Sequence, residues 1–396
     1  MIMSVAVQYA RLPGESFEDY KVRICENKNV YGLTFEQIAD ILNAESGNTY
    51  TESKWRKEWK SFCKGRVYER NKISNSMLVE QSRELEKQRM RLSEERAALK
   101  RIVRDEARMD AWREEVAAQI KDYPSLQKHC FVPIQDNASG TLVVLLTDLH
   151  IGMQFDNSVG KYNSEIARDR LYQYASEVAE AVIRWQPSKC AILLGGDLIS
   201  GTIHNTIRIE NRESIVQQLK LASEYISEFI VLIESMFQKI DVYGVSGNHS
   251  RTIQNKDDAT LGDMLDDLVP VYLQARLSAF EHIVIHENKE NKALESFYVE
   301  NNHSVLVHGE YDDMSEANIG KLQRLTGGLI DVVFTAHLHE NMFKDVTGVN
   351  VIRGGCLSGS GDEYCLKKRL SGQPSQMMSY FASDGKLKAL IPVYFD

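Results

Sequence analysis

Five short apolar runs in the C-terminal two thirds of the chain each lead directly into histidine, aspartate or asparagine. The runs are residues 142–146, 191–194, 242–245, 305–307 and 332–335. Short apolar runs of this kind are typical of buried β-strands, and segments with a helical pattern separate several of them, for example 165–185 and 214–237. In layered α/β domains functional sites gather where strands end and loops begin. The pattern therefore predicts that the residues after these strands converge on one place.

The residues at the strand ends are of the types that bind metal ions. They are Asp148, His150, Asp197, Asn248, His249, His308, His337 and His339. Imidazoles combined with carboxylates and an amide oxygen suit divalent first-row metals such as Mn, Fe, Zn or Ni. The set contains no thiolate, which argues against a structural zinc site. A single carboxylate such as Asp197 can bridge two ions roughly 3.5–4 Å apart.

The order and spacing of these residues resemble a known family, the calcineurin-like metallophosphoesterases. The matching blocks, from about residue 141 to 345, are Asp148-x-His150, Gly196-Asp197, Gly247-Asn248-His249, His308 and His337-x-His339. The resemblance implies an α/β fold for residues 138–396, with two mixed β-sheets packed as a sandwich and flanked by helices. It also implies hydrolysis of a phosphoester with two bound metal ions.

Individual roles follow from the same resemblance. Asp148, His150 and His339 would hold the first metal, and Asn248, His308 and His337 the second. Asp197 would bridge both ions, and with His249 it forms the expected catalytic pair. Mn²⁺ is the expected metal, with Fe, Zn and Ni as alternatives.

The expected mechanism follows from these roles. A hydroxide activated by the two metals would attack phosphorus, and His249 would give a proton to the leaving oxygen. Two positions depart from the family pattern. Ser250 replaces the acid that normally orients the catalytic histidine, and Ala336 replaces a glycine. Another group must therefore orient His249.

Residues 1–72 predict a compact all-α unit of the helix-turn-helix type. A helix near residues 34–43 has a capping-box pattern, with Thr34 as the cap and Gln37 three residues later. A turn at 46–48 precedes a second helix, whose apolar face would carry Trp55, Trp59 and Phe62. Residues 51–72 contain eight Lys or Arg and three Glu, which favours DNA binding. The alternative is a helical bundle that binds protein or caps a neighbour. The candidate DNA contacts are Lys54, Arg56, Lys57 and Lys60.

Residues 73–128 predict a long helical linker, because the first Gly or Pro in this stretch is Pro124. Leucines recur every seven residues at 78, 85, 92 and 99, which favours a coiled-coil homodimer through residues 76–122. The residues four places after the first three leucines are Ser82, Arg89 and Arg96, which are poor core residues. A solvated helical spacer is therefore the alternative.

Composition predicts a cytoplasmic protein, in the host cytoplasm if it is phage-encoded. No apolar run approaches the ~20 residues that span a bilayer, and the N-terminus lacks a signal-peptide pattern. We therefore expect no membrane partner. The six cysteines form no C-x-x-C pair and predict reduced thiols rather than a zinc-thiolate site. The net charge of −9 argues against a general nucleic-acid coat protein but leaves local basic surfaces open.

The substrate is predicted from the accompanying segments. No Arg-Gly pair follows the Gly196-Asp197 block closely, which disfavours the Ser/Thr phosphatase branch. The basic N-terminal unit favours resemblance to the DNA-repair nucleases, and more loosely to phosphoesterases of phages and prophages. We therefore expect a DNA exonuclease or endonuclease, with a partner ATPase left open. Alternatives are a phosphodiesterase for cyclic or small nucleotides and a non-catalytic DNA-binding or assembly factor. The candidate substrate contacts are His204, Asn205, Arg251, Lys367, Lys368 and Arg369.

Overall fold

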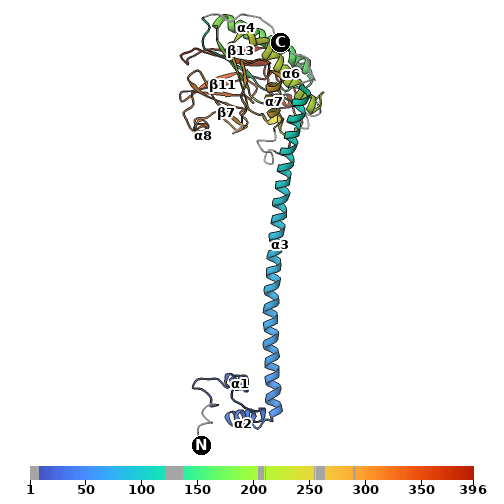
Figure 1. Ribbon diagram of the computed structural model, residues 1–396, viewed down its shortest axis with the longest axis vertical. Helices are drawn as coiled ribbons and strands as arrows, with labels where there is room; N and C mark the ends of the chain where they lie inside the picture. Colours follow the sequence, from blue (N-terminus) through green and yellow to red (C-terminus); the bar gives the residue numbers. More distant parts are fainter. Residues whose placement is uncertain are drawn as a thin grey trace. The chain divides into compact units, whose positions relative to one another are not determined.

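The computed structural model describes residues 9–120, 126, 137–203, 209, 211–253, 255, 264–288 and 291–396. Within the long helix it describes only the backbone of residues 73–76 and of several residues between 101 and 119. The chain divides into two compact units, Met1–Lys100 and Arg101–Asp396, and the blue end of the colour scale in Figure 1 marks the first. No helix among the described residues is both long and apolar enough to cross a membrane.

The N-terminal unit begins with two short helices, α1 (Phe17–Glu26) and α2 (Phe35–Ser46). The predicted capping box opens α2, because Thr34 Oγ1 accepts from the backbone N–H of Gln37 and Gln37 Oε1 accepts from that of Thr34. Gly47 closes α2 in the left-handed conformation, at φ 71°. Both predicted helix ends are therefore confirmed. The small core combines residues of both helices with Trp55.

The third helix, α3, runs without a break from Glu52 to Ile120. The predicted boundary between residues 72 and 73 thus lies inside one helix. The sequence permits an unbroken helix here because the segment contains no proline and a single glycine, Gly65. Trp55 is buried and Trp59 half-buried, but Phe62 is 40% exposed, so the predicted apolar face is shorter than expected. The four heptad leucines are 51–61% exposed. A homodimer through this stretch stays a prediction.

The C-terminal unit contains two mixed sheets. The six-stranded sheet has the order β13-β12-β1-β4-β5-β6. Strands β1, β4, β5 and β6 are parallel to one another, and β12 pairs antiparallel with both β1 and β13. Its strands are β1 (Thr141–Leu146), β4 (Lys189–Leu194), β5 (Lys239–Gly244), β6 (Ile283–Ile285), β12 (Ser375–Phe381) and β13 (Leu387–Tyr394).

The five-stranded sheet has the order β10-β11-β9-β8-β7, with β11, β9 and β8 parallel and both edges antiparallel. Its strands are β7 (Leu294–Val299), β8 (Asn302–Val307), β9 (Val332–Thr335), β10 (Met342–Val346) and β11 (Val349–Arg353). A separate small ribbon pairs β2 (Phe155–Asp156) with β3 (Lys161–Tyr162).

The two sheets pack face to face because their strands alternate apolar side chains between two cores. In β1, Val143 and Leu145 pack between the sheets with Leu306 and Phe334 of the other sheet. The opposite face of the first sheet packs against helices α4 (Ser164–Trp185), α6 (Ile215–Ile233) and α7 (Leu268–Arg276). Helix α8 (Glu316–Thr326) covers the second sheet (Figure 1). The predicted α/β sandwich flanked by helices is therefore confirmed.

Strand register brings the predicted ligand loops to one edge. Leu146, the last residue of β1, pairs with Leu194 of β4, which pairs in turn with Gly244 of β5. In the second sheet Leu306 of β8 pairs with Phe334 of β9. Parallel strands that end at the same level place their following loops side by side. The short elements that complete the unit are η1 (Glu234–Met236), η2 (Asn248–Ser250), η3 (Leu265–Asp267) and α9 (Glu363–Lys368).

Candidate metal centre

The loops after β1, β4, β5, β8 and β9 meet at a cluster of histidines and carboxylates. Three groups of side chains have their ligand atoms all within 4.8 Å of one another. The first group contains His150, His339 and Cys356, the second His150, Asp197 and His249, and the third Asp197, His308 and His337. Asp197 belongs to two of these groups. The convergence predicted from the five strand ends is thus present in the structure.

The backbone of these loops is strained where it carries the candidate ligands. Asp148, His150, Asp197, His337 and His339 all have positive φ angles, between 48° and 71°. Each non-glycine residue in this region costs about 1–3 kcal/mol and persists only where its surroundings enforce it. Such residues concentrate at functional sites. The strain is the expected result of turning the backbone sharply at the strand ends.

On one side of the centre, histidine nitrogens face each other and a buried carboxylate. Nε2 of His150 lies 3.2 Å from Nε2 of His339, which in turn lies 3.5 Å from Asp148 Oδ1. The other oxygen of Asp148 accepts from the Thr147 hydroxyl at 2.9 Å and from the backbone N–H of His337 at 3.1 Å. The carboxylate is thus fixed with one oxygen aimed at the histidines.

On the other side, His308 lies at the centre of the remaining candidate ligands. Its Nε2 lies 3.2 Å from Asp197 Oδ2, from Asn248 Oδ1 and from His337 Nδ1. Its Nδ1 lies 2.8 Å from the carbonyl oxygen of Gly195, which fixes the ring. A single N–H cannot serve three acceptors at once, so this concentration of lone pairs suits a cation.

Among the described residues, Asp148 Oδ1 and His150 Nδ1 have no hydrogen-bond partner, and only the ion pair with His339 Nε2 at 3.5 Å reaches Asp148 Oδ1. Both residues are fully buried. Buried polar atoms are nearly always paired, and leaving one unpaired costs about 1–3 kcal/mol. The donor set and the unpaired Asp148 Oδ1 therefore fit bound metal ions.

The electrostatics of the centre favour a bound cation as well. Burial alone would raise the pKa of Asp197, but the charges of His308 and His249 outweigh it and hold the pKa well below its usual range. Burial alone would lower the pKa of His308, yet Asp197 raises it to about 9. Burial lowers the pKa of His150 well below 6.5, which keeps this imidazole neutral and able to bind metal.

A backbone carbonyl takes the place of the missing acid beside His249. Nδ1 of His249 lies 2.9 Å from the carbonyl oxygen of Ser200, and its backbone N–H donates to Asp197 Oδ1 at 2.7 Å. The Ser250 hydroxyl instead donates to the carbonyl of Gly247. The expectation that another group orients His249 is therefore met, and Nε2 is left 4.0 Å from Asp197 Oδ2.

Asp266 supports the centre and was not predicted from the sequence. This buried carboxylate accepts from the backbone N–H of Asp197 and from that of Gly247, both at 3.0 Å. Burial and the nearby charge of Asp197 raise its pKa to about 7. One side chain thus fastens the loops after β4 and β5 together. In the sequence Asp266 is one of two adjacent aspartates before helix α7, a pattern that does not indicate a role in joining loops.

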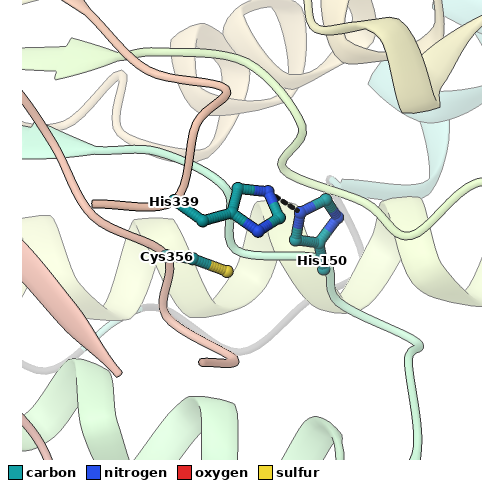
Figure 2. A group of neighbouring side chains, drawn as sticks. All are labelled: His150, His339 and Cys356. Atoms are coloured by element: carbon teal, nitrogen blue, oxygen red, sulfur yellow. Dashed lines mark hydrogen bonds between the residues drawn. The ribbon is translucent and has the colours of Figure 1, made fainter. Parts of the chain in front are cut away.

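Cys356 is the second residue of the centre that was not predicted from the sequence. It follows β11 after two glycines, and its sulfur joins the group of His150 and His339 (Figure 2). The sequence offered one signal, because Cys356 comes shortly after an apolar run, as the predicted ligands do.

The candidate substrate contacts lie in different settings. Arg251 is buried and forms an ion pair with Glu310 at 3.4 Å, so it is not a surface cation. Lys367, Lys368 and Arg369 are exposed at the end of α9, and Lys367 pairs with Glu363. His204 and Asn205 lie outside the described residues.

The four candidate DNA contacts are exposed in the first turns of α3, namely Lys54, Arg56, Lys57 and Lys60. Lys54 lies 3.8 Å from the centre of the Tyr50 ring, and Arg56 forms an ion pair with Glu52 at 3.3 Å. Each side chain remains on the surface of the N-terminal unit.

Sequence comparison relates the chain to a prophage protein. The family described as the YonJ N-terminal domain matches residues 6–74, close to the predicted N-terminal unit. Over 376 residues the chain is 24% identical to the SPbeta prophage-derived uncharacterized protein YonJ of Bacillus subtilis, covering 90% of this chain and 91% of the relative. The similarity therefore extends over both units.

Solved structures similar to the chain include Vps29 from Cryptosporidium parvum and an archaeal phosphodiesterase. The Vps29 structure is 15% identical, with 65% of this chain and all of that chain covered and a TM-score of 0.32. The archaeal phosphodiesterase is 13% identical, with 64% and 99% covered and a TM-score of 0.32. Since both scores are low, we infer function from the side chains of the centre.

Proposed function

We propose that the chain is a metal-dependent phosphodiesterase and that its substrate is DNA. The observation that carries the proposal is the position of Asp197, which lies within ligand distance of two separate groups of histidines. A carboxylate shared between two ligand groups is the arrangement that two-metal phosphoryl transfer requires.

The side chains divide naturally between two divalent cations. Asp148, His150 and His339 would hold one ion, and Asn248, His308 and His337 the other, with Asp197 contributing to both. When bound, the cations would make a water molecule more acidic and offset negative charge on a phosphoryl group.

His249 is placed to move a proton. Its Nδ1–H donates to the Ser200 carbonyl, which leaves Nε2 on the side of Asp197. An N–H at Nε2 can give its proton to the oxygen that leaves phosphorus, which is the role of a general acid. The Ser200 carbonyl keeps the ring in the orientation that this transfer needs.

DNA is the favoured substrate because the N-terminal unit exposes a cluster of cations. Lys54, Lys57 and Lys60 lie near the start of α3, where they can contact phosphates of a nucleic-acid backbone. Phosphate contacts of this kind supply affinity without sequence specificity. Dimerisation through residues 76–122 would present two such clusters to one nucleic acid.

Cleavage of end-labelled single- and double-stranded DNA with Mn²⁺ tests the proposal. Wild type should cleave, and His249→Ala and Asp197→Ala should not. His286→Gln is the matched control, since His286 pairs with Asp241 away from the centre and should leave cleavage unchanged. Hydrolysis of cyclic or small nucleotides with no cleavage of any DNA would overturn DNA as the substrate.

A triple replacement of Lys54, Lys57 and Lys60 by alanine tests the role of the N-terminal unit. DNA affinity should fall and its salt dependence should flatten, because each phosphate contact that is removed reduces the number of released counterions. Hydrolysis of a small aryl phosphodiester should stay unchanged. The matched control replaces three exposed lysines of the C-terminal unit, Lys321, Lys344 and Lys388. Equal losses in both triple variants would contradict a specific role for the cluster.

A further inference from the structure

Cys356 lies inside the candidate metal centre although it was predicted to be an ordinary reduced thiol. It is fully buried. Its Sγ, one ring nitrogen of His150 and one ring nitrogen of His339 all lie within 4.8 Å of one another. Figure 2 shows the sulfur directed toward the two imidazole rings from the loop below them. Its other contacts are the backbone oxygen of Asp148 at 3.2 Å and the Ser358 hydroxyl at 3.0 Å.

The other polar atoms around this sulfur are arranged as metal ligands. Among the described residues, the buried Asp148 Oδ1 has no hydrogen-bond partner. Asp148 Oδ1 is directed at His339 Nε2, 3.5 Å away. The Nε2 atoms of His150 and His339 are 3.2 Å apart, close enough for both nitrogens to bind one ion at about 2.0–2.1 Å.

The backbone on both sides of Cys356 is firmly held. Gln376 Nε2 donates to the carbonyls of Thr147 and Gly355, at 2.8 and 3.2 Å, so the loops after β1 and β11 are joined. Arg170 Nη1 donates to the carbonyl of Leu357 at 2.7 Å. A Cβ on Gly354 would lie 2.6 Å from Thr147 Cγ2, so the loop packs against β1 with no room to spare. Such support is what fixes a metal ligand in place.

We propose that Cys356 is a sulfur ligand of the ion held by Asp148, His150 and His339. The mixed nitrogen, oxygen and sulfur donor set selects Zn²⁺, Co²⁺ or Fe²⁺ over Mn²⁺ and Mg²⁺, because thiolate favours the softer ions. This inference rests on the metal sites of the proposed function. It implies that the two sites prefer different metal ions. The site that contains His308 and His337 has no sulfur donor among its described neighbours.

Co²⁺ loading of the full-length protein tests the assignment without any substrate. Thiolate ligation of Co²⁺ produces a sulfur-to-metal charge-transfer band in the near ultraviolet, separate from the visible bands that report bound Co²⁺. Wild type should show both, and Cys356→Ser should keep the visible bands and lose the sulfur band. Zn²⁺ affinity of this variant should fall about 10- to 100-fold, with a smaller change for Mn²⁺.

Cys365→Ser is the discriminating variant, because Cys365 is also buried, lies in helix α9 and forms a side-chain hydrogen bond with His339 of the same group. It should retain the sulfur band. Bound Co²⁺ without a sulfur band in wild type would overturn the inference alone, as would loss of the band in Cys365→Ser but not in Cys356→Ser. Failure to bind any Co²⁺ would overturn the proposed function together with it.

X-ray absorption of the Zn²⁺-loaded wild type gives a second test that needs no variant to fold. A zinc–sulfur distance near 2.3 Å would support the assignment. A coordination shell of nitrogen and oxygen alone would overturn it.

Discussion

Replacing Asp266 by alanine should loosen the two ligand loops that its carboxylate joins. Asp266 Oδ2 accepts from the backbone N–H groups of Asp197 and Gly247, both at 3.0 Å. Alanine leaves two buried donors without an acceptor. Asp266→Asn keeps an oxygen of the same size in the same place, so it should preserve most of the connection.

The magnitude follows from the two hydrogen bonds that the substitution removes. An unsatisfied buried donor costs about 1–3 kcal/mol, so two donors together cost roughly 2–3 kcal/mol after partial relaxation. Since 1.4 kcal/mol corresponds to a factor of ten, amide hydrogen exchange in the two loops should accelerate roughly 30- to 150-fold.

Hydrogen exchange followed by mass spectrometry measures this effect in peptides that contain Asp197 and Gly247. Asp241→Asn is the control, because it removes a carboxylate that pairs with Lys239 and His286 in the first half of β5, before the ligand loop. Equal protection of the loops in wild type and Asp266→Ala would refute the reasoning. So would equal acceleration in the control.

Three further variants test separate parts of the centre. Gly201→Ala should abolish phosphodiester hydrolysis but retain metal, since Gly201 has a φ of +72° and a Cβ there would overlap the His249 carbonyl oxygen; hydrolysis at the wild-type rate would contradict this placement. Because the pKa of His308 is raised to about 9, protonation of this residue adds up to about 3 kcal/mol to the stability of the chelator-treated protein. This contribution is complete below pH 6.5 and is lost as the pH rises through 9. His308→Gln should therefore flatten that decline in urea unfolding, and an unchanged pH profile would contradict it. Arg170→Met removes buried hydrogen bonds to the backbone carbonyls of Leu357 and Ser358 and should destabilise the fold by about 3 kcal/mol. Arg168→Met, which breaks an exposed pair on the same helix, should cost at most about 1 kcal/mol. Equal losses in the two variants would contradict the role assigned to Arg170.

The sandwich and most of the centre could be predicted because they depend on local patterns. Each apolar run that predicted a strand is a strand, and each is followed by the expected ligand type. Strand register then brings the ligand loops together, since β1, β4 and β5 end at the same level. The capping box at Thr34 was likewise visible because it joins residues three apart.

The supporting contacts could not be predicted because they join distant parts of the chain. Asp266 lies 69 positions from the amide of Asp197 that it binds, and Ser200 acts through its backbone carbonyl, which every residue has. Cys356 lies beside His150 because β11 and β1 belong to different sheets that meet at this edge. The uninterrupted helix α3 shows a different limit, since the boundary predicted between residues 72 and 73 lies inside one helix.

The most direct test of the central claim combines metal content with hydrolysis of a small aryl phosphodiester in the same preparations. We expect two ions per wild-type chain and turnover that disappears with chelation. Asp197→Asn should lose ions and turnover together, while His249→Gln should keep both ions and lose turnover. Turnover that persists in the metal-free protein or in both variants would contradict a metal-dependent phosphodiesterase built on Asp197 and His249.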